Sequence, residues 1–136
     1  MDLLVNIDVP DLARAIAFYT EAFGLIVTRR IGAEIAELSG LPVKLYLLQK
    51  PEGSFGAGKD PRRYGRHWTP VHLDVVVDDV EAALARAVAA GARAETEVRV
   101  YDWGKIAVLS DPFGHGFCVV QFLGRGYDEI AERAGG

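Results

Sequence analysis

The chain of 136 residues contains one sequence unit twice. Residues 3–12 align with residues 71–80 at a constant offset of 68 positions, and in both stretches a strand-like apolar pattern runs up to an aspartate. A second match, residues 45–49 over residues 117–121, lies at an offset of 72 positions and closes each unit. The repeat predicts a fold built from two copies of one supersecondary unit that differ by only a few loop residues.

The first unit reads as a strand, a helix and three more strands. Residues 3–9 alternate between an apolar and a more polar face, which predicts a strand buried on one side. Asp11 is expected to cap a helix whose apolar residues recur at steps of three and four until Gly24. Three strand-like segments follow, near residues 26–31, 34–39 and 43–49. The predicted order is therefore β-α-β-β-β.

The second unit repeats this order. We expect a strand over residues 71–77 and a helix over residues 79–90 that ends at Gly91. Three more strands are predicted, near residues 94–101, 104–110 and 116–123. Residues 51–69, between the units, form a linker too long for a simple turn, and loops of this length are usually functional or mobile. A short helix is expected over residues 127–134.

These elements predict a single α+β domain over residues 1–136, because a chain of this length with 50% hydrophobic residues is long enough for one compact core. Its parts are a first module, a linker, a second module and a C-terminal tail, over residues 3–50, 51–69, 70–124 and 125–136.

Composition and charge disfavour several classes of function. A net charge of −4 weighs against nucleic acid as a partner, and the basic stretch over residues 59–67 is expected to be a solvated loop. No apolar run approaches the roughly 20 residues that a membrane span requires, and the chain start lacks a basic signal segment. The single cysteine, Cys118, excludes an intrachain disulfide. We therefore expect a cytoplasmic protein without nucleic-acid or membrane partners.

The turn over residues 110–116 contains Asp111-Pro112-Phe113-Gly114 and leads into the last strand. Together with the two β-α-β-β-β units and an Asp-Leu or Asp-Val pair at each helix start, it resembles the glyoxalase/bleomycin-resistance/dioxygenase superfamily, also called vicinal oxygen chelate proteins. The resemblance covers essentially the whole chain. It implies two βαβββ modules that form paired half-barrels, a ligand or metal between them, and a homodimer. Members include lyases, ring-cleaving dioxygenases, thiol transferases and drug-sequestering proteins, so function stays open.

In the metal-dependent members that this chain resembles, one ligand comes from the first and one from the last strand of each unit. The corresponding positions here are Leu4, Tyr46, His72 and Cys118. Leu4 has no donor atom, and a tyrosine phenol titrates near ~10. A catalytic zinc site takes three protein ligands and a water, so a third residue would have to join His72 and Cys118. The candidates are Asn6, Asp8 and Asp74. No cofactor is certain, and a divalent metal (zinc, nickel, manganese or iron) held through His72 is the alternative.

Polar residues on the inward strand faces predict a polar cavity, because polar groups are costly to bury unless water or a ligand meets them. The candidate ligand-binding residues are Asn6, Asp8, Lys44, Tyr46, Trp68 and Trp103. The two tryptophans are expected to line either a ligand cleft or a subunit contact. The candidate catalytic residues are His72, Asp74 and Cys118.

Each candidate catalytic residue also has a structural interpretation. His72 is either a functional residue or a core histidine whose ring is satisfied by Asp74. Cys118 is either a small buried hydrophobe or, with His72 within hydrogen-bond reach, a nucleophile. His115, in the turn before the last strand, is expected to face solvent.

Three functions compete. The first is binding of a small molecule between the half-barrels without a full metal site, and an acidic cavity would favour a cationic or hydroxyl-rich ligand. The alternative is a metal-dependent glyoxalase-like lyase or dioxygenase, in which a divalent ion on His72 polarises an oxygen and Asp74 or Asp8 moves the proton. The third is a structural or regulatory homodimer with Trp68 at the interface.

Overall fold

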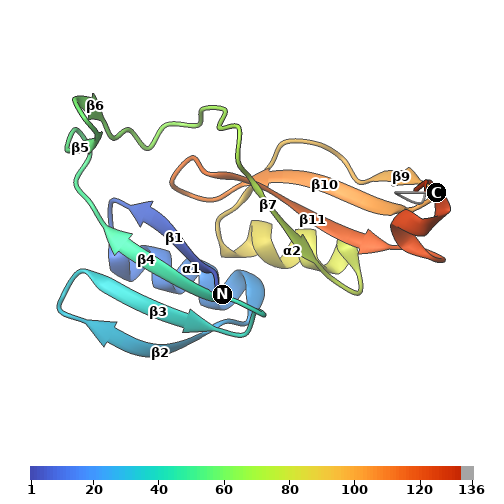
Figure 1. The fold of residues 1–136 in the computed structure, drawn as a ribbon, viewed down its shortest axis with the longest axis horizontal. Helices are drawn as coiled ribbons and strands as arrows, with labels where there is room; N and C mark the ends of the chain where they lie inside the picture. The colour runs from blue at the N-terminus through green and yellow to red at the C-terminus, as the bar shows by residue number, and fades with distance from the viewer. Residues whose placement is uncertain (133–136) are drawn as a thin grey trace.

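Two modules of similar architecture lie side by side in the computed structural model, which describes residues 1–132 (Figure 1). The first module comprises β1 (Leu4–Val9), α1 (Leu12–Phe23), β2 (Ile26–Ile31), β3 (Ile35–Ser39) and β4 (Lys44–Gln49). The second comprises β7 (Leu73–Val76), α2 (Val80–Ala90), β8 (Arg93–Ala94), β9 (Arg99–Tyr101), β10 (Gly104–Ser110) and β11 (Gly116–Phe122). The predicted α+β fold is confirmed.

The two sheets share one topology, as the repeat predicts. In the first module the strand order is β1-β4-β3-β2, and β1 and β4 are parallel. In the second module the order is β7-β11-β10-β8, with β9 also paired to β10, and β7 and β11 are parallel. The first strand of each module therefore lies at the edge of its sheet, and these two edges face each other across the molecule (Figure 1).

The repeated glutamine at the end of each unit has a structural role. The Gln49 side chain accepts a hydrogen bond from the first backbone N–H of α1, and Gln121 accepts one from the first N–H of α2, both at 2.9 Å. Asp11 and Asp79 accept from N–H groups two residues further into the same helices. At each helix start, the glutamine of the last strand and the N-cap aspartate thus each bind a backbone N–H group that has no partner within the helix.

One face of each sheet packs on the helix of its module, and α1 packs against α2, so the modules share a core. Fully buried core residues include Val9, Phe18, Leu38, Leu47, Val80, Leu109 and Val119. The opposite face of each sheet points away from the helices, and we call it the open face. It carries Asn6, Glu37 and Tyr46 in the first sheet, and Asp74 and Cys118 in the second.

The prediction of one continuous strand over residues 94–101 is wrong, because the structure has two short strands there, β8 and β9. The interruption follows from the hydrogen bonds around Val108. Its carbonyl accepts from the N–H groups of both Glu95 and Thr96, and its own N–H donates to the Thr96 hydroxyl at 3.0 Å. Two residues thus share one partner position, which breaks the regular ladder.

The linker over residues 51–69 contains structure that the sequence did not predict. β5 (Phe55–Ala57) and β6 (Asp60–Pro61) form a small hairpin beside the first module (Figure 1). The chain after the hairpin is held by Arg62, whose Nε lies 2.7 Å from the Asp8 carboxylate, and by Tyr64, whose hydroxyl donates to the Lys50 carbonyl at 2.7 Å. We call residues 61–67 the strap, because they connect the two modules.

In the tail, the structure shows a 3-10 helix, η1 (Gly126–Glu129), where a helix over residues 127–134 was expected. Residues 133–136, the end of the predicted tail over residues 125–136, lie outside the described part of the chain. Within residues 1–132, neither helix has the length and apolar character needed to cross a membrane.

Candidate functional site

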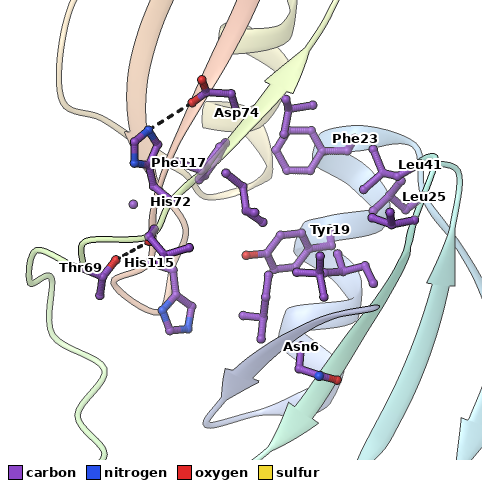
Figure 2. A pocket seen from close by; sticks show the side chains of 18 of the residues that line it. Asn6, Tyr19, Phe23, Leu25, Leu41, Thr69, His72, Asp74, His115 and Phe117 are labelled. Carbon is purple, nitrogen blue, oxygen red and sulfur yellow. Dashed lines mark hydrogen bonds and ion pairs between the residues drawn. The ribbon is translucent and has the colours of Figure 1, made fainter. Parts of the chain in front are cut away.

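A cleft of about 810 Å³ opens between the first strand of each module (Figure 2). The first module contributes apolar side chains to it, among them Val5, Ile7, Tyr19, Phe23, Leu25 and Leu41. The second module and the chain that leads into it contribute Val71, Leu73, Val75 and Phe117, together with the polar residues His67, Thr69, His72, Asp74 and His115. The cleft is therefore mainly apolar; Asn6 and Asp8 are polar residues that line it from the first module, and more polar residues line it from the other side.

Tyr19 and Phe23 on α1 form one wall of the cleft, and Phe117 of the second module lies next to Phe23 (Figure 2). Phe23 and Phe117 pack edge to face with ring centroids 5.4 Å apart. The Tyr19 hydroxyl donates to a carboxylate oxygen of Asp111 at 2.6 Å, and burial, reinforced by this carboxylate, raises the pKa of Tyr19 well above its ordinary value. The same bond joins the helix of the first module to the second module.

The Asp111-Pro112-Phe113-Gly114 turn is shaped by the same aspartate. The second carboxylate oxygen of Asp111 accepts the backbone N–H groups of Phe113 at 2.8 Å and of His115 at 2.9 Å. Gly114 has a φ of 86°, and a Cβ there would lie 2.7 Å from backbone atoms of Tyr64 and Gly65 in the strap. The motif that carries the family resemblance is thus also the point where strap and second module meet.

The expectation that His115 faces solvent is wrong. The side chain is half-buried and lines the cleft, and its Nε2 lies 2.7 Å from the backbone carbonyl oxygen of Asp8 in β1. The sequence offered no signal for this contact, because it depends on how the turn of one module reaches the edge strand of the other. His115 therefore links the modules on the floor of the cleft.

The three candidate catalytic residues lie together on the open face of the second sheet. The His72 Nε2 and an Asp74 carboxylate oxygen are 3.4 Å apart, and the potential ligand atoms of His72, Asp74 and Cys118 all lie within 4.8 Å of one another. Burial, with a smaller contribution from Asp74, raises the pKa of the Cys118 thiol to about 11. The thiol is thus protonated at neutral pH, which is unfavourable for a nucleophile.

A buried carboxylate that the sequence analysis did not single out lies on the open face of the first sheet. Glu37 accepts hydrogen bonds from Tyr46 at 2.6 Å, from Thr28 at 2.9 Å and from the Arg29 Nε at 3.0 Å. These bonds, from Arg29 first, lower the pKa of Glu37 to about 2. Tyr46 in turn has a raised pKa because it donates to this carboxylate. Glu37 pairs across the strands with Arg29 and Tyr46, which can both donate hydrogen bonds to a carboxylate. This pairing is the signal that could have identified the network.

The predicted ligand-binding residues divide between two environments. Asn6 and Asp8 line the cleft, and the Asp8 carboxylate is ion-paired with Arg62. The remaining four lie outside the lining of the cleft. Tyr46 is bonded to Glu37 and Lys44 donates to Ser39 at 2.6 Å, while Trp68 is 79% exposed and Trp103 packs among Tyr101, Phe122 and Tyr127.

The four ligand positions implied by the family resemblance do not fit a metal ion as a set. Leu4 offers only carbon atoms, and the Tyr46 hydroxyl is committed to Glu37. The donors that do lie together are the imidazole, carboxylate and thiol of the second module. Among residues 1–132, the three side chains whose donor atoms lie this close together all belong to the second module.

A protein-family model, the glyoxalase-like domain, matches residues 4–120. An uncharacterized protein of Mycobacterium bovis is 31% identical over 112 residues, which is 79% of this chain and 74% of that protein. The chain belongs to the glyoxalase-like domain family, within the superfamily that the repeat and the turn resemble.

Solved structures show the same fold. A glyoxalase/bleomycin resistance protein/dioxygenase family enzyme from Burkholderia phytofirmans superposes with a TM-score of 0.69 at 21% identity, covering 90% of this chain and all of that one (100%). A fosfomycin resistance protein from Listeria monocytogenes superposes with a TM-score of 0.68 at 14% identity, covering 89% of this chain and 92% of that one. At these identities the similarity establishes the fold alone.

Proposed function

We propose that this chain binds a largely apolar small molecule in the cleft between its modules. The observation that carries the proposal is the cleft itself, whose volume of about 810 Å³ is within the range of small-molecule sites and whose walls are apolar and aromatic. The polar groups of the second module, chiefly His72 and Asp74, would orient the ligand through one polar end (Figure 2).

The geometry changes the class of ligand that the sequence favours. A cationic or hydroxyl-rich ligand was expected because acidic residues were predicted to face the cavity. Asp8 is instead paired with Arg62, and Glu37 with Arg29, so neither carboxylate is free to attract a cation. The carboxylate of Asp74 beside His72 is the acidic group that remains in the cleft lining. An apolar body with one polar group suits this lining better.

The neutral dye Nile red tests the proposal, because its fluorescence rises in apolar sites. We expect saturable binding to the wild type, and at least about tenfold weaker binding to Leu73→Trp, which fills the cleft from a residue that is 40% exposed. Val100→Trp is the control, since Val100 is 65% exposed on β9, outside the cleft. Equal binding by both variants, or no saturable binding by the wild type, would contradict the proposal.

A second candidate function is a metal-dependent, glyoxalase-like lyase or dioxygenase that uses His72. The observation in its favour is the cluster of donor atoms from His72, Asp74 and Cys118. A divalent ion there would polarise an oxygen of the bound molecule. The protein residues would hold the ion and, through the cleft, place the substrate beside it.

We propose in addition that the protein is a homodimer located in the cytoplasm. Support for the dimer comes from large apolar side chains exposed on or beside the open faces, including Leu4, Ile26, Ile31, Val76 and Phe122. Large apolar side chains exposed on one face of a sheet form a surface that a second copy of the chain could cover. Light scattering should give about twice the chain mass of 14.8 kDa at micromolar concentration, and a mass equal to that of one chain would refute the dimer.

A further inference from the structure

We infer that His72, Asp74 and Cys118 form a thiolate-containing zinc site confined to the second module, with an open coordination position that faces the cleft. The inference rests on the second candidate function and names its ligand set and its metal. It differs from the arrangement implied by the family resemblance, in which both modules supply ligands.

Strand pairing brings the three side chains together. Asp74 on β7 and Cys118 on β11 are directly paired residues of a parallel ladder, so their side chains lie next to each other on the open face. His72 immediately precedes β7, and its Nε2 lies 3.4 Å from a carboxylate oxygen of Asp74. The register of the sheet thus sets the juxtaposition of Asp74 and Cys118, and His72 joins them from the residue just before β7.

The spacing suits one small ion. Zinc bonds of about 2.0–2.3 Å place the ligand atoms of a tetrahedral site roughly 3.3–3.8 Å apart. In the structure the His72 and Asp74 atoms are 3.4 Å apart, and the largest separation within the cluster stays within 4.8 Å. Side-chain rotation by His72 and Asp74 can close the remaining gap, because both side chains are partly exposed, at 57% and 38%.

The chemistry of the donors selects the metal. A thiolate is a soft ligand and favours zinc or cobalt, whereas manganese and magnesium prefer carboxylate, carbonyl and water oxygens. Binding of the ion would displace the proton of the Cys118 thiol, and the resulting thiolate with one carboxylate balances the charge of a divalent ion when the imidazole is neutral. Aspartate beside histidine alone would make an ordinary ion pair, and the buried sulfur is what distinguishes this cluster.

Three protein ligands leave a fourth position, as in catalytic rather than structural zinc sites. His72 and Asp74 both line the cleft, whereas the buried Cys118 anchors the site from the sheet side. The fourth position therefore lies toward the cleft, where a polar group of the bound molecule would meet the metal. This would give the apolar cleft its one point of chemical specificity.

Cobalt substitution tests the ligand set without an activity assay. Metal-free wild-type protein titrated with Co²⁺ should develop a near-ultraviolet thiolate-to-cobalt charge-transfer band at one equivalent, and Zn²⁺ but not Mn²⁺ should abolish it. Cys118→Ser should remove this band. His72→Gln, at an exposed position that the fold tolerates, should weaken Co²⁺ binding by at least about tenfold, and so should Asp74→Asn.

The control is Asp102→Asn, an exposed aspartate in the turn between β9 and β10, which should bind Co²⁺ like the wild type. The inference is overturned if the wild type shows no charge-transfer band, if Mn²⁺ competes as well as Zn²⁺, or if Asp74→Asn binds like the control. Nile red binding, measured on the same metal-free protein, reports on the cleft separately. Loss of metal binding with retained dye binding would refute the zinc site and leave the first proposal standing.

Discussion

At the scale of single residues, polar side chains on the open faces are organised into local networks rather than left free for a ligand. Glu37 is the clearest case, since it is almost fully buried and receives hydrogen bonds from Arg29, Tyr46 and Thr28. A buried carboxylate is stabilised as a charged group only while such donors remain in place. Glu37 therefore makes the first sheet sensitive to acid.

The pKa of Glu37 gives a prediction about acid stability. Its folded-state pKa is about 2, below the ordinary value of 4.5, so its contribution to stability is complete above about pH 4.5 and is lost as the pH falls toward 2. In Glu37→Gln this contribution is absent at every pH. We expect urea midpoints of the wild type and the variant to converge between pH 4.5 and pH 2.

The exposed Glu97 provides the control, because Glu97→Gln should leave the pH dependence of the urea midpoint unchanged. If the midpoints of wild type and Glu37→Gln stayed parallel down to pH 2, the network around Glu37 would not hold the carboxylate charged in the folded state.

At the scale of the elements, the strap depends on a close backbone approach to the last turn. Gly114 and Gly53 have nearly the same positive φ, 86° and 83°, but a Cβ on Gly114 would meet the strap backbone at 2.7 Å, whereas one on Gly53 would meet no atom within 4 Å. Comparing an alanine substitution at each glycine thus separates the free-energy cost of the backbone conformation from the cost of a steric clash.

We predict that Gly114→Ala lowers the free energy of unfolding by more than Gly53→Ala does, by an additional ~1–3 kcal/mol typical of overpacking. Urea denaturation of both variants and the wild type measures the difference. Equal losses would mean that the strap can move away from the turn at little cost, and that it does not fix the position of the second module.

The sequence predicted the elements better than their contacts. Alternation and the two aspartate–glycine helix boundaries were sufficient for β1, α1, β7 and α2, because these signals are local. The break at Thr96 and the role of His115 were missed, because both depend on bonds to residues distant in the chain. For the site, the repeat and the family resemblance located His72 and Cys118, and strand period two placed Asp74 on the face of His72. None of these signals could reveal that Arg62 neutralises Asp8.

At the scale of the whole molecule, side-chain bonds hold the two modules together, and Tyr19, His115 and Asp8 among these groups also line the cleft. Tyr19 bonds Asp111, His115 bonds the Asp8 carbonyl, and Arg66 in the strap bonds Glu95 through two guanidinium nitrogens at 2.6 and 3.0 Å. The cleft is thus formed within one chain by contacts between its modules. A molecule bound there would touch Tyr19 and His115, two of the residues that join the modules.

The bond between Tyr19 and Asp111 is the strongest test of this coupling, because both groups are buried. Tyr19→Phe keeps the ring but leaves one Asp111 carboxylate oxygen without its hydroxyl donor. Hydrogen bonds to charged groups contribute about 1.5–3 kcal/mol, so we expect a loss of this size in the free energy of unfolding. Tyr127→Phe, at a residue that is half-exposed on η1, should change it by less than about 0.5 kcal/mol. If Tyr19→Phe were as stable as Tyr127→Phe but bound Nile red more weakly, Tyr19 would serve the ligand rather than the joint between the modules.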